Sequence, residues 1–273
     1  MNIKDLLNRI DKIVPFSLSE VWDNTGLIVG DNEMPVYDIC LTLDATPEVI
    51  DQAVNAECNV IITHHPLIFT PISNVDTSSF TGSVIKKAIK TDTAIISLHT
   101  NWDKSGLNNT LASALKLNDI RTLQPQKKEE DRIGVIGELP QKKNPDSFMR
   151  IVKDAWNLSH IIYYGAKGIK QISSVAICGG ASSEFWIDAL HEEADVYITA
   201  EVKYHHRLAA AYNGLSVMQA DHYEMENFSL LSLAKALKKI TKNNIRIITP
   251  NIEIKTLISD ANHGGWPSVG SIE

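Results

Sequence analysis

Residues 60–66, Val-Ile-Ile-Thr-His-His-Pro, join a short apolar run to a polar ending. The β-branched side chains are typical of a buried strand, and Pro66 prevents its continuation as a regular central strand because proline cannot donate a ladder hydrogen bond. Ligands of α/β proteins bind beyond the carboxyl ends of strands, so His64 and His65 are candidate site residues. Neighbours on an extended chain point in opposite directions, so the two histidines can reach two different metals, or one can brace the other.

The alternation of strands and helices continues on both sides of this segment. Apolar alternation and helix caps predict strands at residues 37–43, 60–63, 94–98, 133–139, 175–178, 196–199 and 216–219, and helices at residues 6–14, 46–56, 83–91, 107–117, 147–156, 184–192, 202–211 and 228–240. Strands separated by helices indicate parallel sheets that are covered on both faces. The polar residues 124–131 are expected to form an exposed connection.

The second half of the chain repeats the first in three places. Residues 43–45 end a strand and lead into a helix, as residues 179–181 do; residues 61–63 correspond to 197–199, and residues 97–103 to 220–226. The sequence therefore predicts an α/β fold with two similar α/β/α lobes related by an internal repeat. We expect the first lobe at residues 1–124, the second at 125–248, and a C-terminal extension at 249–273 that is either a flexible end or an added segment.

Composition argues against several classes of protein. The 273 residues carry 26 Lys and Arg against 33 Asp and Glu, a net charge of −7, whereas nucleic-acid-binding surfaces are basic. A membrane helix needs about 18 apolar residues, and no run approaches that length. Cys40, Cys58 and Cys178 lie far apart without a CxxC pair, which favours buried thiols in a reducing compartment. We therefore expect a cytoplasmic protein that binds neither nucleic acid nor a membrane.

Two further histidine motifs follow later strands. His99 precedes Asp103 by four residues and His222 precedes Glu226 by four, so each pair lies on one face if its segment is helical. Imidazole and carboxylate without thiolate favour Zn, Mn, Fe, Co or Ni. More than four such ligands suggest two bridged ions, which would activate a hydroxide for hydrolysis. The alternative is ordinary structure, with hydrogen-bonded histidines after a strand and solvated helix faces.

Four motifs in order carry a resemblance to a known family. They are residues 22–30, Trp-Asp-Asn-Thr-Gly-Leu-Ile-Val-Gly; residues 63–69, Thr-His-His-Pro-Leu-Ile-Phe; residues 99–103, His-Thr-Asn-Trp-Asp; and residues 222–226, His-Tyr-Glu-Met-Glu. Over residues 6–248 the chain resembles the GTP cyclohydrolase I type 2 homologues, also called NIF three-like proteins. It resembles their short form, because the connection at 124–132 is too short for the inserted regulatory domain of the long form. The resemblance implies the NIF three-like fold and a toroidal homohexamer, with a dinuclear metal site in each subunit facing the central cavity.

The resemblance also implies the ligands. Matching the motifs residue by residue gives two divalent ions per subunit and the metal ligands His64, His65, Asp103, His222 and Glu226, with His99 as a further ligand or a brace. Residues 22–24 are interpreted as a packed corner that orients the double-histidine loop. The chain departs from the family pattern at Asp221 and Ala200, where the family usually has glycine. The added charge of Asp221 could shift the metal preference or repel a triphosphate.

The family name implies a reaction on a small-molecule substrate. In the opening of the guanine ring of GTP, a metal-bound hydroxide attacks C8 and formate is released. Glu226, Asp103 or Glu224 would transfer protons, because such groups must lie within hydrogen-bond reach. Another hydrolytic substrate, such as a phosphoester, fits the same metals equally well. A non-enzymatic hypothesis stays open as well: a hexameric metal-binding or regulatory protein that binds a partner.

Overall fold

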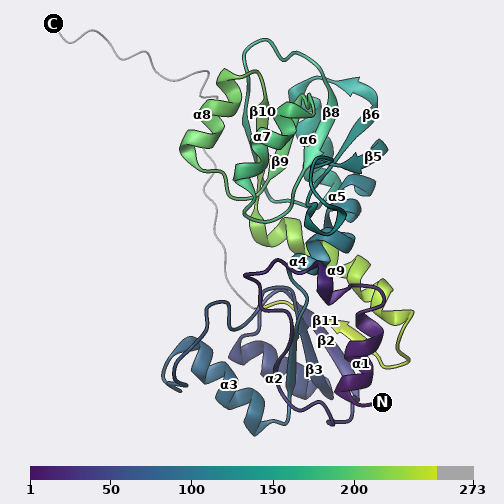
Figure 1. Cartoon of the computed structure of the whole chain (residues 1–273), viewed down its shortest axis with the longest axis vertical. Coiled ribbons are helices and arrows are strands. Elements are labelled where there is room, and N and C mark those ends of the chain that lie inside the picture. Colours follow the sequence, from purple (N-terminus) through teal and green to yellow (C-terminus); the bar gives the residue numbers. More distant parts are fainter. Residues whose placement is uncertain (251–273) are drawn as a thin grey trace, which may run out of the picture.

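The computed structural model describes residues 1–250. Nearly all of the expected extension at 249–273 therefore lies outside the described residues. Figure 1 shows two lobes stacked along the long axis of the molecule, with the short helix α4 (Thr100–Trp102) and the long helix α9 (His222–Lys238) between them. Within residues 1–250, no helix combines the length and apolar character that crossing a bilayer requires.

The first lobe is built on a five-stranded sheet with the order β1-β4-β3-β2-β11. Its strands are β1 (Gly26–Val29), β2 (Asp38–Thr42), β3 (Cys58–Thr63), β4 (Ala94–Ser97) and β11 (Ile245–Ile247), and its helices are α1 (Ile3–Ile10), α2 (Pro47–Asn55) and α3 (Phe80–Lys90). All neighbouring strands are parallel except β1, which pairs antiparallel with β4. As the sequence predicts, Thr46 caps α2: its hydroxyl accepts a hydrogen bond from the backbone of Val49 at 3.2 Å.

The second lobe is built on a six-stranded sheet with the order β5-β6-β8-β9-β10-β7. Its strands are β5 (Asn118–Thr122), β6 (Val135–Lys143), β7 (Ile161–Tyr164), β8 (Ile172–Ile177), β9 (Val196–Thr199) and β10 (Ser216–Ala220), and its helices are α5 (Asn108–Ala114), α6 (Pro145–Ala155), α7 (Trp186–His191) and α8 (Tyr204–Tyr212). Strands β8, β9 and β10 are parallel, whereas β5, β6 and β7 pair antiparallel with their neighbours.

The two sheets confirm the α/β class with two similar lobes. Each contains a parallel triplet, β2-β3-β4 in the first lobe and β8-β9-β10 in the second. In each, an antiparallel strand covers the outer edge of the third member, β1 beside β4 and β7 beside β10. The prediction of parallel sheets is wrong at β1, β5, β6 and β7, which pair antiparallel with their neighbours. Of these, β6 was predicted as a strand and only its direction was missed, whereas the short strands were not recognised. Strands of three to five residues, such as β1, β7 and β11, are too short for a clear alternation pattern.

The sheets also divide the chain differently from the expected boundary at 124/125. Residues 118–122 belong to the second sheet, because β5 pairs with β6. After α9 the chain returns to the first lobe, where β11 pairs with β2 and places Ile245 beside Ile39. The first lobe is therefore completed by a strand from the far end of the described chain.

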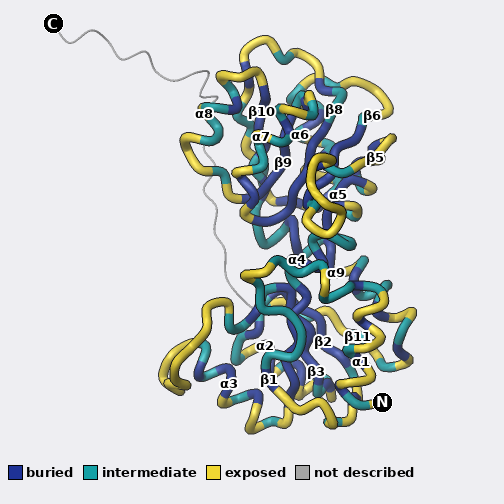
Figure 2. The backbone as a smooth tube through the Cα atoms, viewed as in Figure 1, coloured by how far each residue is buried: buried dark blue, intermediate teal, exposed yellow. Residues whose placement is uncertain are grey.

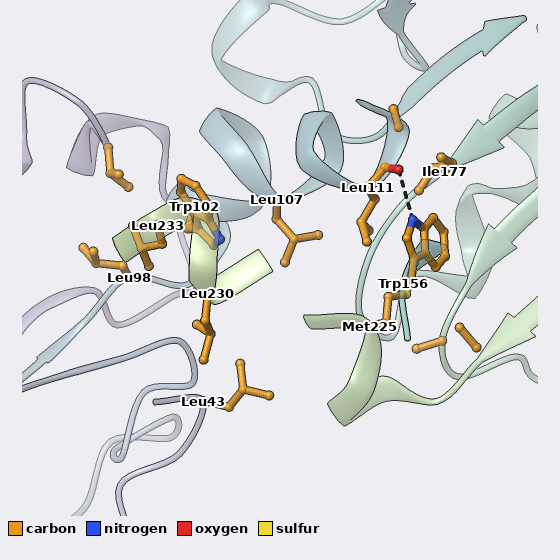
Figure 3. Packing of buried hydrophobic residues seen from close by; sticks show 14 of the residues in the cluster. Leu43, Leu98, Trp102, Leu107, Leu111, Trp156, Ile177, Met225, Leu230 and Leu233 are labelled. Carbon is orange, nitrogen blue, oxygen red and sulfur yellow. Dashed lines mark hydrogen bonds between the residues drawn. The ribbon is translucent and has the colours of Figure 1, made fainter. Parts of the chain in front are cut away.

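One long hydrophobic core joins the lobes. Figure 3 shows Trp102, Leu230 and Leu233 packed near the first lobe and Trp156 and Ile177 in the second, all members of one buried cluster. The indole of Trp156 donates a hydrogen bond to the carbonyl of Leu111 at 3.0 Å. Figure 2 shows that the central strands β3, β4, β8, β9 and β10 are mostly buried, while the outer ends of both lobes are largely exposed. This shared core fixes the lobes relative to each other, so side chains from both can form one site.

Candidate metal centre

The six predicted ligands come together at the junction of the lobes. His64 and His65 directly follow β3, and His99 follows β4. Asp103 begins a π-helical turn, Asp103–Leu107, directly after α4. His222 and Glu226 lie in the first two turns of α9, which begins six residues earlier than predicted. It does so because Asp221 caps it, accepting a hydrogen bond from the backbone of Glu224 at 3.0 Å.

Glu226 lies at the centre of the cluster. It is 2% exposed, and its Oε1 lies 3.0 Å from His222 Nε2 and 3.6 Å from His64 Nε2. Its Oε2 lies 2.9 Å from His65 Nε2, and His64 Nε2 lies 3.6 Å from Asp103 Oδ1. Two overlapping groups could hold a metal ion, with their ligand atoms within 4.8 Å of one another: His64, His65 and His99, and His65, His222 and Glu226.

All four histidines are oriented by an oxygen at Nδ1. The four pairs are His64 with the carbonyl of Leu98 at 3.0 Å, and His65 with Asp44, His99 with Asp23 and His222 with Glu201, each at 2.9 Å. An imidazole that donates from Nδ1 to an oxygen keeps the lone pair of Nε2 for a metal, and such outer carboxylates are a regular feature of metal sites. The arrangement is therefore that of prepared nitrogen ligands.

Asp44 and Glu201 were not predicted as site residues. A signal was present in their positions: Asp44 follows the strand predicted at 37–43, and Glu201 follows the one at 196–199. Asp23, by contrast, lies in the run interpreted as a corner that orients the double-histidine loop. Its neighbour Asn24 does hold that loop, because its amide donates to the carbonyl of Ile68 at 2.7 Å. Trp22 is not packed as expected; it is 58% exposed.

Asp23 is held as a carboxylate beside His99. Its side chain is fully buried, and it accepts hydrogen bonds from the backbone amide and the hydroxyl of Thr100 at 3.0 and 2.5 Å. Burial alone would raise its pKa, but the hydrogen bonds from His99 and Thr100 outweigh this and lower the pKa to about 2. Asp23 therefore orients His99 with a full negative charge.

The charges of the cluster compensate one another only in part. Burial raises the pKa of Asp103 to about 6, although His64 favours its charged form. Burial opposes ionisation of Glu226 too, but His64, His222 and His65 lower its pKa well below the usual range. Burial lowers the pKa of His65, but its hydrogen bond to Asp44 and the nearby negative charge of Glu226 outweigh this and raise it to about 10. In the metal-free protein, positive charge on the imidazoles therefore offsets part of the carboxylate charge.

Buried atoms without a partner mark the position that a cation would fill. His64 Nε2 and Asp103 Oδ1 are buried without a hydrogen bond, and Glu226 Oε2 makes none despite its closeness to His65. Such atoms are costly, and each usually has an explanation. A divalent cation between them would satisfy all three. Nitrogen and carboxylate donors suit the zinc, manganese, iron, cobalt and nickel ions expected from the sequence.

Two further residues near the cluster have structural roles, and one of them, Glu224, departs from its predicted role. Glu224 points to another partner, since its Oε2 accepts hydrogen bonds from the backbone and hydroxyl of Ser159 at 2.7 and 3.0 Å. Gly180, in the loop after β8, has φ of +69°, and a Cβ there would lie 2.8 Å from Glu226 Oε1. Its main structural role is therefore to let the loop pass close to Glu226.

We expect Asp23→Asn to weaken binding of Zn²⁺ or Mn²⁺ about 10- to 100-fold, because the amide no longer orients His99 with a negative charge. Calorimetric titration of the metal-free protein measures the effect. Asp38→Asn is the matched control: that carboxylate also accepts a backbone hydrogen bond, from Asn244 at 2.8 Å, but at the opposite end of β2. Equal metal affinity of the two variants would contradict the role of Asp23.

Two α/β lobes with a histidine and carboxylate cluster at their junction define an α/β protein with a candidate metal centre between its lobes. The family model for Duf34/NIF3 (NGG1p interacting factor 3) matches residues 1–256. The chain belongs to this family, which confirms the resemblance carried by its motifs.

Named relatives agree with this membership. The chain is 33% identical over 252 residues to the GTP cyclohydrolase 1 type 2 homolog of Clostridium perfringens, covering 91% of this chain and 95% of that protein. It is 32% identical over 241 residues to the GTP cyclohydrolase 1 type 2 of Helicobacter pylori, covering 86% and 91%. The crystal structure of a hypothetical protein of Staphylococcus aureus superimposes with a TM-score of 0.80 at 28% identity, covering 92% and 97%.

Proposed function

We propose that this protein is a hydrolase that binds two divalent metal ions at the junction of its lobes and acts on a nucleotide. One observation carries the proposal: four histidines are each oriented at Nδ1, three of them hold Nε2 within 3.6 Å of Asp103 or Glu226, and three buried atoms of the cluster lack a hydrogen-bond partner. A purely structural cluster would use those atoms internally. His64, His65, His99, His222, Asp103 and Glu226 would hold the ions.

The ions, when bound, supply Lewis acidity and stabilise negative charge on the reacting group. The chain's own residues do the rest. Asp103 and Glu226 line the cavity in front of the cluster, so their carboxylate oxygens can accept or return a proton there. Glu224, which was a third candidate for this role, does not line that cavity and is bound to Ser159. The proposal therefore assigns proton transfer to Asp103 and Glu226.

The cavity supports a small-molecule substrate. Its volume is about 530 Å³, which is within the range of small-ligand sites, and residues of both lobes line it. The relative from Helicobacter pylori is named for an activity on GTP. GTP, with opening of the guanine ring and release of formate, is therefore the substrate to test first.

The test combines metal analysis with an activity assay. Purified protein loaded with Zn²⁺, Mn²⁺ or Fe²⁺ is expected to contain two ions per subunit and to release formate from GTP. His65→Ala is expected to lose this activity, because His65 belongs to both ligand groups. His191→Ala, an exposed histidine of α7, is the matched control and keeps it. Metal-loaded protein without turnover of any nucleotide or ester would favour the non-enzymatic metal-binding hypothesis.

The proposal includes a homohexameric ring in the cytoplasm. The hexamer is what the resemblance to the NIF three-like proteins implies. Buried free thiols at Cys40, Cys58 and Cys178 suit a reducing compartment. Light scattering gives the mass of the assembly, and His65→Ala must keep that mass for its loss of activity to be attributed to the site.

A further inference from the structure

One wall of the cavity carries a cation that the metal centre does not use. Among the described residues that line the cavity, Lys127 is the one lysine or arginine, while Glu20, Asp103, Glu184 and Glu226 are acidic. No carboxylate of residues 1–250 forms an ion pair with the Lys127 ammonium group. That group lies over the ring of Phe185, 5.4 Å from its centroid. It is thus an exposed cation at a cavity whose other lining residues are acidic, aromatic, histidine, aliphatic or small.

The backbone that presents Lys127 is fixed. The amide of Lys127 donates to the carbonyl of Gln124 at 3.2 Å, and its carbonyl accepts from the side chain of Arg132 at 3.0 Å. Gln124, expected in an exposed connection, is instead buried, and its side chain bonds Asp188 at 3.0 Å and the amide of Ile133 at 3.2 Å. Because this turn is held by its own side chains, Lys127 is positioned before any ligand binds, which lowers the cost of binding.

The loop is also held against the first lobe, beside Asp103. The ammonium of Lys104 lies 2.8 Å from Glu20 Oε1 and donates to the carbonyl of Glu130 at 2.9 Å. Glu20 is thereby neutralised, which leaves the charge of Lys127 available to a ligand. The loop and the metal centre thus face the same cavity from fixed positions.

Aromatic side chains complete the cavity. Trp22 and Phe69 from the first lobe lie with ring centroids 5.6 Å apart, and each ring contacts that of His99, at 6.1 and 6.2 Å. Phe185 from the second lobe also lines the cavity. Trp22 and Phe69 are more than half exposed, so a flat ring can stack on them.

We propose that Lys127 selects substrates that carry a phosphate group, binding that group at the rim while the aromatic residues hold the planar ring beside the metal ligands. The reaction of the bound substrate rests on the proposed function. The test of Lys127 does not, because it measures binding. A charge-assisted contact of an ammonium with phosphate discriminates against the uncharged analogue about tenfold. It also weakens as salt is added, since an exposed pair is screened.

The test compares GTP with guanosine on the metal-loaded protein. Tryptophan fluorescence in the first seconds after mixing gives both Kd values before turnover depletes the ligand. In Lys127→Met the preference for GTP over guanosine is expected to fall about tenfold, with guanosine binding unchanged, whereas Lys127→Arg keeps the preference. Lys128→Met removes a neighbouring exposed charge that does not line the cavity, and is the matched control.

Two outcomes overturn the assignment. One is an unchanged preference in Lys127→Met; the other is a protein that binds neither ligand. The first is distinguishable from failure of the proposed hydrolase, and the second is distinguishable from it when another nucleotide or ester is turned over. The hydrolase proposal is wrong if the protein shows no metal-dependent turnover. It stands if turnover persists while Lys127→Met retains the wild-type preference for GTP over guanosine.

Discussion

Glu226→Gln is expected to lower the affinity for divalent cations about 100-fold or more and to reduce the number of ions bound per subunit. Glu226 offers both oxygens to the cluster, one beside His222 and His64, the other beside His65. Glutamine keeps the shape but removes the charge and replaces one oxygen with a donor that repels a cation. Because loss of an outer carboxylate already costs about 10- to 100-fold, loss of this central ligand costs more.

Metal content after dialysis, and titration of the metal-free protein, measure this effect. Glu224→Gln is the matched control, since it makes the same chemical change two residues earlier on α9, where the side chain binds Ser159. It is expected to bind ions like the wild type. If Glu226→Gln kept two ions at wild-type affinity, the proposed centre would be wrong, whatever the activity.

The candidate site was more predictable than the sheets around it. His64, His65, His99 and His222 follow parallel strands, and strand ends in α/β proteins meet at one edge, so the sequence alone brings each half of the site together. The internal repeat then relates the halves: His99 and Asp103 in one correspond to His222 and Glu226 in the other. That the halves face each other across the lobe junction depends on the shared core, which no local pattern predicts.

What could not be predicted lies in contacts between distant segments. Asp44 and Glu201 are unremarkable loop residues until the fold places each 2.9 Å from a histidine Nδ1. In the sequence, Lys127 is likewise only one residue of a charged connection. The hydrogen bonds that hold its loop place it at the cavity. Strand β11 joins the first sheet because the chain crosses back after α9, and a three-residue strand carries almost no periodic signal.

Trp102→Ala is expected to lower the free energy of unfolding by about 3–5 kcal/mol, the usual cost of removing a buried indole. Trp102 is 4% exposed in the core that joins the lobes, and its Nε1 donates to the hydroxyl of Ser229 on α9 at 3.1 Å. Trp102 is also connected to two metal ligands. Asp103 is the next residue in the chain, and Ser229, which accepts the hydrogen bond, lies one helical turn beyond Glu226. The void that Trp102→Ala leaves in the core would therefore loosen Asp103 and Glu226, two metal ligands from different lobes, together.

Urea unfolding of the metal-free protein measures the stability, and metal titration measures the consequence for the site. Trp102→Phe separates the two contributions, because it keeps a ring in the core but loses the bond to Ser229; about 1–2 kcal/mol is expected. If the shared core positions the halves of the site, metal affinity follows the order wild type, Trp102→Phe, Trp102→Ala. Full metal affinity in a destabilised Trp102→Ala would show instead that the ligands hold their geometry without the packing between the lobes, and the junction would lose its role in building the centre.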